Sequence, residues 1–232
     1  MSKAANEPFN WRRAEIFEQL YFVGNQSVVI ILICVCFAAV VTILESSFHM
    51  KLVVQNDSLV PGFAAMLILR EIGSVITALL LVSRVGAGIA AEVGLMEITE
   101  QNDALRMLGI NPIHYLVWPR LVACVLGGVV LTILADLVCL EAALLISESH
   151  LGFTAALFLS SLRRFVGFSD LLFSAVKGAV FGMVIPLVSC AFGFRCRAGA
   201  VGVGSATTNS VVTASILIII LDFIMSALFL GF

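Results

Sequence analysis

The sequence predicts an all-α integral membrane protein, and three observations support this fold class. Of the 232 residues, 61% are hydrophobic and only 12% are charged. A soluble domain carries roughly 25% charged residues and about 45–50% apolar ones, and the mean hydropathy here is +1.12. The apolar residues also form runs long enough to cross a bilayer, separated by Pro, Gly and polar clusters. We therefore expect a single membrane domain over residues 1–232.

The first predicted element is a helix over residues 8–24 that lies in the membrane interface. Its large side chains recur mostly at three- and four-residue spacing, with Trp11 and two arginines beside them; they are Phe9, Ile16, Phe17, Leu20 and Tyr21. This spacing is typical of an amphipathic helix with its apolar face in lipid. The alternative is a solvated leader segment.

Five apolar stretches predict transmembrane helices. They cover residues 27–45, 58–86, 120–146, 171–194 and 208–230. Each is long enough, with its flanks, to cross a hydrocarbon core about 30 Å thick. Three glycines before the last stretch, Gly199, Gly202 and Gly204, predict a loop. Five crossings place the two ends of the chain on opposite sides of the membrane.

Residues 92–108 (EVGLMEITEQNDALRML) predict a short amphipathic helix outside the membrane. Four acidic residues and one arginine interleave there with apolar ones; the key members are Glu92, Glu97, Glu100, Leu105 and Leu108. Gly109 and then Asn111-Pro112 supply a stop signal. An anionic lipid surface would repel the acidic residues, so a protein partner is favoured over lipid headgroups.

Basic residues near the ends of the predicted spans indicate orientation, because cytoplasmic loops carry an excess of Lys and Arg. With the N-terminus inside, eight fall on the cytoplasmic side: Lys3, Arg12, Arg13, Arg84, Arg106, Arg120, Arg195 and Arg197. Three fall outside: Lys51, Arg163 and Arg164. We expect a cytoplasmic N-terminus and a C-terminus on the other side.

Six ionisable residues fall inside the predicted spans: Arg70, Glu71, Asp136, Glu141, Lys177 and Asp222. Each costs about 2.5–3.5 kcal/mol at the centre of a bilayer, so we expect them to pair and to face a bundle interior or a wet cavity. Lys177 has Glu71 or Asp222 as candidate partners, and Arg70 has Asp136 or Asp222. Arg70 and Glu71 point about 100° apart on a helix and need different partners. The alternative is that these charges only fix the helix packing.

Several classes of site lack support in the sequence. No P-loop motif occurs, so any ATP-driven action needs a partner chain. No His or Cys stands at the spacing of a metal site, and no catalytic serine motif is found. No run of Lys and Arg could neutralise a nucleic-acid backbone. We predict no catalytic residues, no metal and no nucleic acid.

The stretch LREIGSVITALLLVSRVGAGIAAEVGLMEITEQNDALRMLGINP, residues 69–112, closely resembles the central signature of MlaE/YrbE-type permeases. These are membrane subunits of ABC transporters that work with MCE proteins. A second match is GVGSATTNSVV, residues 202–212, and the five-span layout also agrees. Ser74 departs from the family pattern, which often has proline there, so the resemblance gives less support for a kink at this position.

The resemblance implies a homodimeric permease in the bacterial inner membrane that moves phospholipids between the inner and outer membranes. Its partners would be a cytoplasmic ABC ATPase, which would bind ATP and Mg, and a periplasmic MCE-domain protein. No cofactor is implied for this chain. Residues 92–108 would be the coupling helix, and the lipid cavity would include Arg70, Glu71, Lys177 and Asp222.

Two other functions stay open on the sequence. One is a proton-coupled secondary transporter that uses Glu71, Asp136 or Asp222 as a relay, and the other is an assembly scaffold that does not transport.

Overall fold

A computed structural model of the chain describes residues 9–25, 27–53, 59–197 and 199–231. These residues form helices joined by short turns, and none of them forms a strand. Five stretches of the described chain are long and apolar enough to cross a membrane: Glu15–Met50, Val60–Ile98, Pro112–Ser149, Phe168–Gly193 and Gly199–Phe229. The predicted fold class, an all-α membrane protein, is confirmed.

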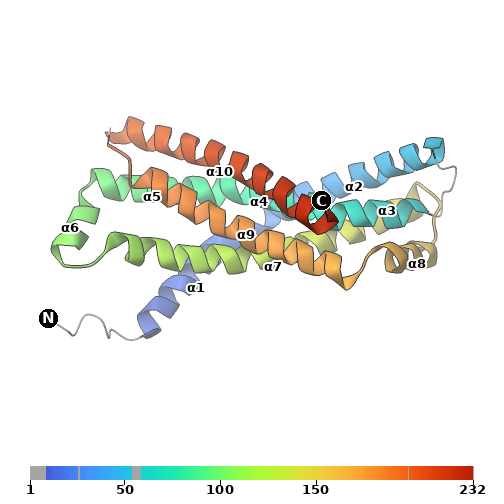
Figure 1. The fold of residues 1–232 in the computed structure, drawn as a ribbon, viewed down its shortest axis with the longest axis horizontal. Coiled ribbons are helices and arrows are strands. Elements are labelled where there is room, and N and C mark those ends of the chain that lie inside the picture. Colours follow the sequence, from blue (N-terminus) through green and yellow to red (C-terminus); the bar gives the residue numbers. More distant parts are fainter. Residues whose placement is uncertain (1–8, 26, 54–58, 198, 232) are drawn as a thin grey trace. The chain divides into compact units, whose positions relative to one another are not determined.

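The N-terminal part contains helix α1 (Phe9–Asn25) and helix α2 (Val28–Val53) (Figure 1). The predicted bounds at positions 8 and 58 lie outside the described residues. Residues 28–44 of α2 are apolar on all sides, and the buried ones form one stripe that recurs every fourth residue, at Ile31, Val35, Ala39 and Ile43. Many of the remaining apolar side chains of α2 are exposed, among them Ile33, Phe37 and Val41, as expected for a helix that faces lipid.

The second candidate span consists of five helical segments without a break. They are α3 (Val60–Leu67), the π-helical turn η3 (Ile68–Ile72), α4 (Gly73–Leu81), a second π-helical turn η4 (Val82–Gly86), and α5 (Ala87–Ile98). π-Helical turns are rare and often mark functional sites. The Arg70-Glu71 pair lies within η3, which the sequence pattern did not reveal.

The prediction of one helix over residues 92–108 is wrong. Residues 92–98 end α5, a turn follows at residues 99–100, and a separate short helix α6 (Gln101–Met107) begins after it. Glu100 adopts a left-handed backbone conformation with φ of 58°. Because a residue in this conformation cannot continue a right-handed helix, the chain changes direction there.

The C-terminal half contains four further helices: α7 (Pro112–Ser149), α8 (Ala155–Phe165), α9 (Phe168–Gly193) and α10 (Gly199–Leu230). Helix α7 starts eight residues before the predicted span 120–146, because Pro112 opens a helix and Asn111 accepts a hydrogen bond from the Ile113 amide at 3.1 Å. Helix α8 was not predicted.

The prediction of a loop at Gly199, Gly202 and Gly204 is also wrong. These glycines form the start of α10, which begins nine residues before the predicted span 208–230. Of these three glycines, only Gly199 has a positive φ, 59°. Continuity with the long apolar helix outweighs the low helix propensity of glycine, about 1 kcal/mol per residue.

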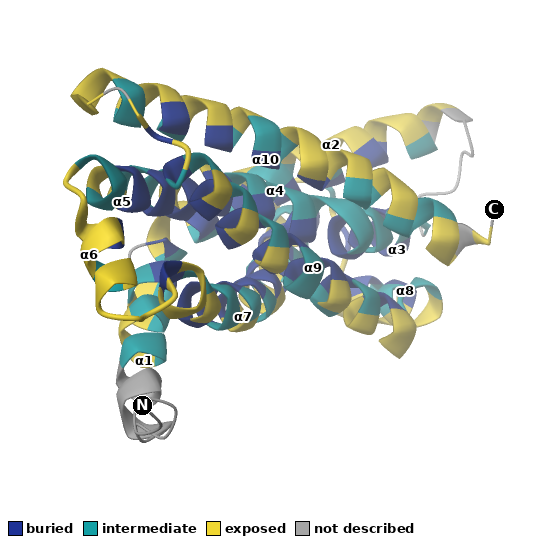
Figure 2. Cartoon of the chain, turned by 60° about the vertical axis from the view of Figure 1, so that its left-hand side comes forward, coloured by how far each residue is buried: buried dark blue, intermediate teal, exposed yellow. Residues whose placement is uncertain are grey.

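The helices form two compact units. Among the described residues, one gathers 9–25, 27, 79–128, 179–197 and 199–220, and the other gathers 28–53, 59–78, 129–178 and 221–231. In the first unit, α7 and α9 approach closely at Gly182, where an added Cβ would meet the Cys124 carbonyl. In the second unit, α8 packs on α3, and Phe165 lies against Gly62. Figure 2 shows that burial follows one face of most helices, while α6 is largely exposed.

Candidate functional site

Four of the six charged residues predicted within the spans gather into one cluster in the second unit, together with Asp170; the four are Arg70, Glu71, Lys177 and Asp222. Arg70 in η3 pairs with Asp170 in the first turn of α9, and Nε lies 2.8 Å from Oδ1. Asp170 is almost fully buried, and its Oδ2 also accepts a hydrogen bond from the Gly167 amide at 2.8 Å. The carboxylate therefore caps the start of α9 and holds the Arg70 side chain at the same time.

Lys177 forms the centre of the cluster. It is fully buried, and its Nζ lies 3.1 Å from Glu71 Oε2 and 2.6 Å from Asp222 Oδ1. It also donates to Ser226 Oγ at 2.8 Å and to the Arg70 carbonyl at 2.7 Å. Ser226 donates in turn to Glu71 Oε1 at 2.7 Å. Helices α9 and α10 and the turn η3 are thus joined through one ammonium group.

The predicted pairings are partly correct. Lys177 contacts both of its predicted partners, Glu71 and Asp222. The prediction that Arg70 pairs with Asp136 or Asp222 is wrong, because its partner is Asp170. Asp170 lies one residue before the predicted span 171–194, although an acid in the first turn of a helix is a recognisable signal.

Two stacked aromatic rings lie next to the cluster. The ring centroids of Phe173 and Phe229 are 4.2 Å apart, with an interplanar angle of 17°. The Arg70 guanidinium carbon lies 5.2 Å from the centroid of Phe229, and Lys177 Nζ lies 4.9 Å from that of Phe173. Both cations are therefore within the range of cation–π attraction.

Two pockets share these rings. The first, about 190 Å³, is lined by Met66, Leu67, Arg70, Glu71, Phe173, Ser226 and Phe229. The second, about 450 Å³, is mostly apolar and is lined by Ser169, Leu172, Phe173, Val176, Met225, Leu228 and Phe229. A charged pocket and an apolar pocket thus meet at one aromatic wall.

Asp136 and Glu141 lie apart from this cluster. Asp136 on α7 is buried, and its Oδ2 accepts a hydrogen bond from Ser174 at 2.5 Å. Within the described residues no ion pair to Asp136 is found, and its Oδ1 has no hydrogen-bond partner. Glu141 is exposed on the same helix. Neither residue lines the two pockets that share Phe173 and Phe229.

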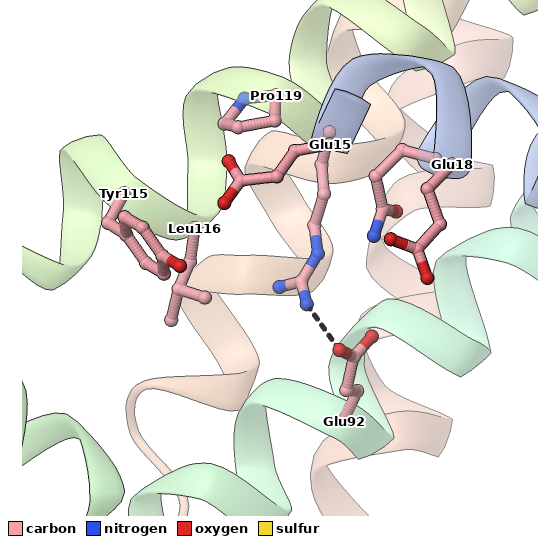
Figure 3. A pocket seen from close by; sticks show the side chains of 8 residues that line it. Glu15, Glu18, Glu92, Tyr115, Leu116 and Pro119 are labelled. Carbon is pink, nitrogen blue, oxygen red and sulfur yellow. Dashed lines mark ion pairs between the residues drawn. The ribbon is translucent and has the colours of Figure 1, made fainter. Parts of the chain in front are cut away.

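The first unit contains a second charged site, around Arg120 (Figure 3). The Arg120 side chain is 4% exposed, and its Nη2 lies 2.8 Å from Glu92 Oε1. A pocket of about 140 Å³ adjoins the pair and is lined by Glu15, Glu18, Gln19, Glu92, Tyr115, Leu116, Pro119 and Arg120. The site links α5 to α7 beside α1.

The residues predicted to contact an ATPase lie on α5, the following turn and α6. Glu97 Oε2 accepts a hydrogen bond from the side-chain amide Nδ2 of Asn102 at 2.6 Å, and Glu100 is exposed in the turn. Leu105 is partly covered, whereas Leu108 is 75% exposed and Met107 is 89% exposed. Met107 was missed by the sequence analysis, although it lies in the same amphipathic segment.

Comparisons with known proteins agree with this architecture. The sequence model described as Permease MlaE matches residues 16–228. A probable ABC transporter permease protein of Rickettsia conorii is 35% identical over 214 residues, 92% of this chain and 82% of the relative. One from Synechocystis is 36% identical over 214 residues, 92% of this chain and 81% of the relative.

A third relative is a plant protein. TRIGALACTOSYLDIACYLGLYCEROL 1, chloroplastic, from Arabidopsis thaliana is 32% identical over 220 residues, 95% of this chain and 62% of the relative. The family match spans nearly the whole chain and both units. The chain therefore belongs to the MlaE family of ABC transporter permeases.

Proposed function

We propose that this permease translocates phospholipids between the inner and outer membranes of a bacterium, as a homodimer driven by a separate cytoplasmic ATPase. A periplasmic MCE-domain protein would receive or deliver the lipid. The N-terminus would be cytoplasmic and the C-terminus periplasmic. ATP and Mg would bind to the ATPase, and α6 with the preceding turn would contact it. An ABC permease needs no proton relay, so the proton-coupled alternative is less favoured.

The paired pockets of the second unit carry this proposal. A phospholipid has a charged headgroup and apolar tails, and a site for it needs both kinds of wall. Arg70, Glu71 and Ser226 provide polar groups in one pocket, and aliphatic side chains line the other. The name of the Arabidopsis relative, which refers to a diacylglycerol lipid, agrees with a lipid cargo.

Photo-crosslinking tests this function. The transporter would be purified with its ATPase and exposed to a phospholipid that carries a photoreactive group on one acyl chain. The Glu71→Lys variant places a second cation beside Lys177 and removes one of its carboxylate partners. We expect crosslinking to fall on the order of fivefold, because the new ammonium group and that of Lys177 repel each other strongly at close range in a low-dielectric site.

The matched control is Glu148→Lys, the same charge reversal at an exposed position near the end of α7. Crosslinking should remain at the native level in this control. Gel filtration of both variants would check that each is folded. Equal crosslinking of the native protein and Glu71→Lys would contradict a lipid site at this pocket.

A further inference from the structure

We propose that the Arg70-Glu71 pocket prefers phospholipids whose headgroup carries an ammonium group as well as a phosphate, over lipids whose headgroup is only anionic. The inference rests on the proposed function, because it names the headgroup class for the same site. It follows from the charge of the cluster, from which members face the pocket, and from how Arg70 is held.

The cluster has a formal net charge of −1. Two cations, Arg70 and Lys177, are joined to three carboxylates, those of Glu71, Asp170 and Asp222, at distances of 2.6–3.1 Å. Two positive charges and three negative ones leave one negative charge in excess. A headgroup with only a phosphate charge would add a second negative charge to this site, and a zwitterionic headgroup would not.

Only part of the cluster can meet a ligand. Arg70 and Glu71 line the charged pocket, and their side chains are 25% and 40% exposed. Lys177 is fully buried, and Asp170 is 3% exposed. Neither of these two residues lines the pocket. A ligand therefore meets one cation and one carboxylate side by side, a pattern complementary to a phosphate and an ammonium on the same headgroup.

Arg70 is held in a fixed position with donors to spare. Its Nε donates to Asp170, and its guanidinium lies over the Phe229 ring. A guanidinium has five N–H donors, so the terminal amino groups remain for phosphate oxygens, a geometry that Arg favours. No bound phosphate is needed to orient it, because Asp170 and Phe229 already do so.

Glu71 also keeps acceptor capacity. Its Oε2 pairs with Lys177 and its Oε1 accepts from Ser226. An ionised carboxylate has about four lone-pair sites, so each oxygen can still accept one hydrogen bond. The exposed part of this carboxylate is the group that would bind an ammonium. The apolar pocket beyond Phe173 and Phe229 would hold an acyl chain.

Competition between lipids on the native complex tests the preference without any variant. The probe is the phospholipid with a photoreactive acyl chain. The competitors are dioleoyl phosphatidylethanolamine, dioleoyl phosphatidylglycerol and N-acetylated dioleoyl phosphatidylethanolamine, all with identical acyl chains. The ethanolamine lipid should compete at a concentration about fivefold lower than the glycerol lipid, the ratio that one partly exposed ion pair of about 1 kcal/mol provides.

The N-acetylated lipid keeps the phosphate and lacks the positive charge, so it should compete as weakly as the glycerol lipid. Equal competition by all three lipids would overturn the headgroup preference and leave lipid binding intact. Competition by none of them, with no crosslinking of the probe, would instead overturn the proposed function.

Two variants locate the preference in the pocket wall. Glu71→Gln removes the exposed negative charge. In this variant the competing concentrations of the ethanolamine lipid and the glycerol lipid should lie within about twofold of each other. Asp222→Asn removes the same unit of charge behind Lys177, at a residue that does not line the pocket, and should reduce the preference less. Crosslinking without competitor reports whether each variant still binds lipid. A larger effect for Asp222→Asn than for Glu71→Gln would overturn the role of Glu71.

Discussion

At Lys177 a full positive charge occupies a position with no exposed surface, and four groups surround its ammonium. Glu71, Asp222, Ser226 and the Arg70 carbonyl each lie within 3.1 Å of Nζ. A buried charge is tolerated when it is paired and hydrogen-bonded, and removal of one partner leaves the others unpaired. The residue thus determines whether three segments of the second unit can pack together.

Lys177→Met should therefore destabilise the protein strongly, by about 3–5 kcal/mol, because it leaves two carboxylates without their cation. Thermal unfolding in detergent would show a lower Tm. The double variant Lys177→Met with Asp222→Asn should recover part of the loss. Arg163→Met, which removes an exposed cation on α8, should leave Tm within the error of measurement. An unchanged Tm for Lys177→Met would contradict the structural role of this charge.

The sequence predicted part of this site. The rule that buried intramembrane charges pair was enough to predict Lys177 with Glu71 and Asp222. It failed for Arg70, because the partner Asp170 lies in the first turn of a helix, where its carboxylate also accepts a hydrogen bond from the Gly167 backbone amide. Burial of Asp170 depends on how η3 and α9 pack, and no spacing in the sequence contains that information. The stacked rings of Phe173 and Phe229 were not predicted for the same reason.

Among the elements, α7 and α9 show how sequence determines the distance between helices. Gly182 has no Cβ, and an added one would meet the Cys124 carbonyl and the adjacent backbone. The ends of helices were predicted less well, since caps such as Asn111 and turns such as Glu100 override apolar periodicity.

Gly182→Ala should separate α7 from α9 and lower stability by about 1–3 kcal/mol, the usual cost of overpacking. Because the obstacle is backbone, no side-chain rotation can relieve the clash. The matched control is Gly204→Ala in α10, where nothing lies within 4 Å of the new Cβ. This control should keep or raise Tm, since Ala favours a helix over Gly by about 1 kcal/mol. Equal Tm changes in both variants would contradict the close approach.

Helix α6 offers a test of the contact with the ATPase. Met107 and Leu108 are the most exposed apolar residues at its end, and hydrophobic anchors dominate most protein interfaces. Met107→Glu and Leu108→Glu should each reduce co-purification of the ATPase by at least about tenfold. These positions are preferable to Leu105, which is partly covered by its own chain.

The control for α6 is Leu159→Glu on α8, another exposed leucine on a short helix. Co-purification should be unaffected by this change. A complex that survives both α6 substitutions would show that the ATPase binds elsewhere on the permease.

For the whole molecule, the main property to establish is its orientation in the membrane. Five stretches of the described chain are long and apolar enough to cross the membrane, and five crossings would place the two ends of the chain on opposite sides. The turns that contain α6 and α8 follow the second and third stretches, and they should therefore face opposite sides as well. The excess of basic residues near one set of span ends predicts that α6 faces the cytoplasm.

Cysteine labelling would check this topology. In a variant with all six native cysteines replaced, Asp103→Cys on α6 and Arg163→Cys on α8 introduce single exposed thiols. An impermeant maleimide applied to spheroplasts should label the α8 variant. The α6 variant should react only after the membrane is permeabilised. The reverse pattern would place the N-terminus outside and exclude the proposed side for the ATPase.

The π-helical turn η3 has a consequence for the phase of the buried face along its span. From Ala64 to Gly94 the buried residues recur as adjacent pairs, at 64–65, 68–69, 73–74, 77–78, 81–82, 85–86, 89–90 and 93–94. Each step is four residues except the one across η3, which is five. The extra residue is Arg70, Glu71 or Ile72, and it turns the helix so that Gly73 rather than Ile72 meets Asp136. A deletion of one residue in η3 would restore a regular α-helix and rotate its later part by about 100° relative to the earlier part. The buried pairs that follow the deletion would then turn away from the interior, and their neighbours along the helix would take their places.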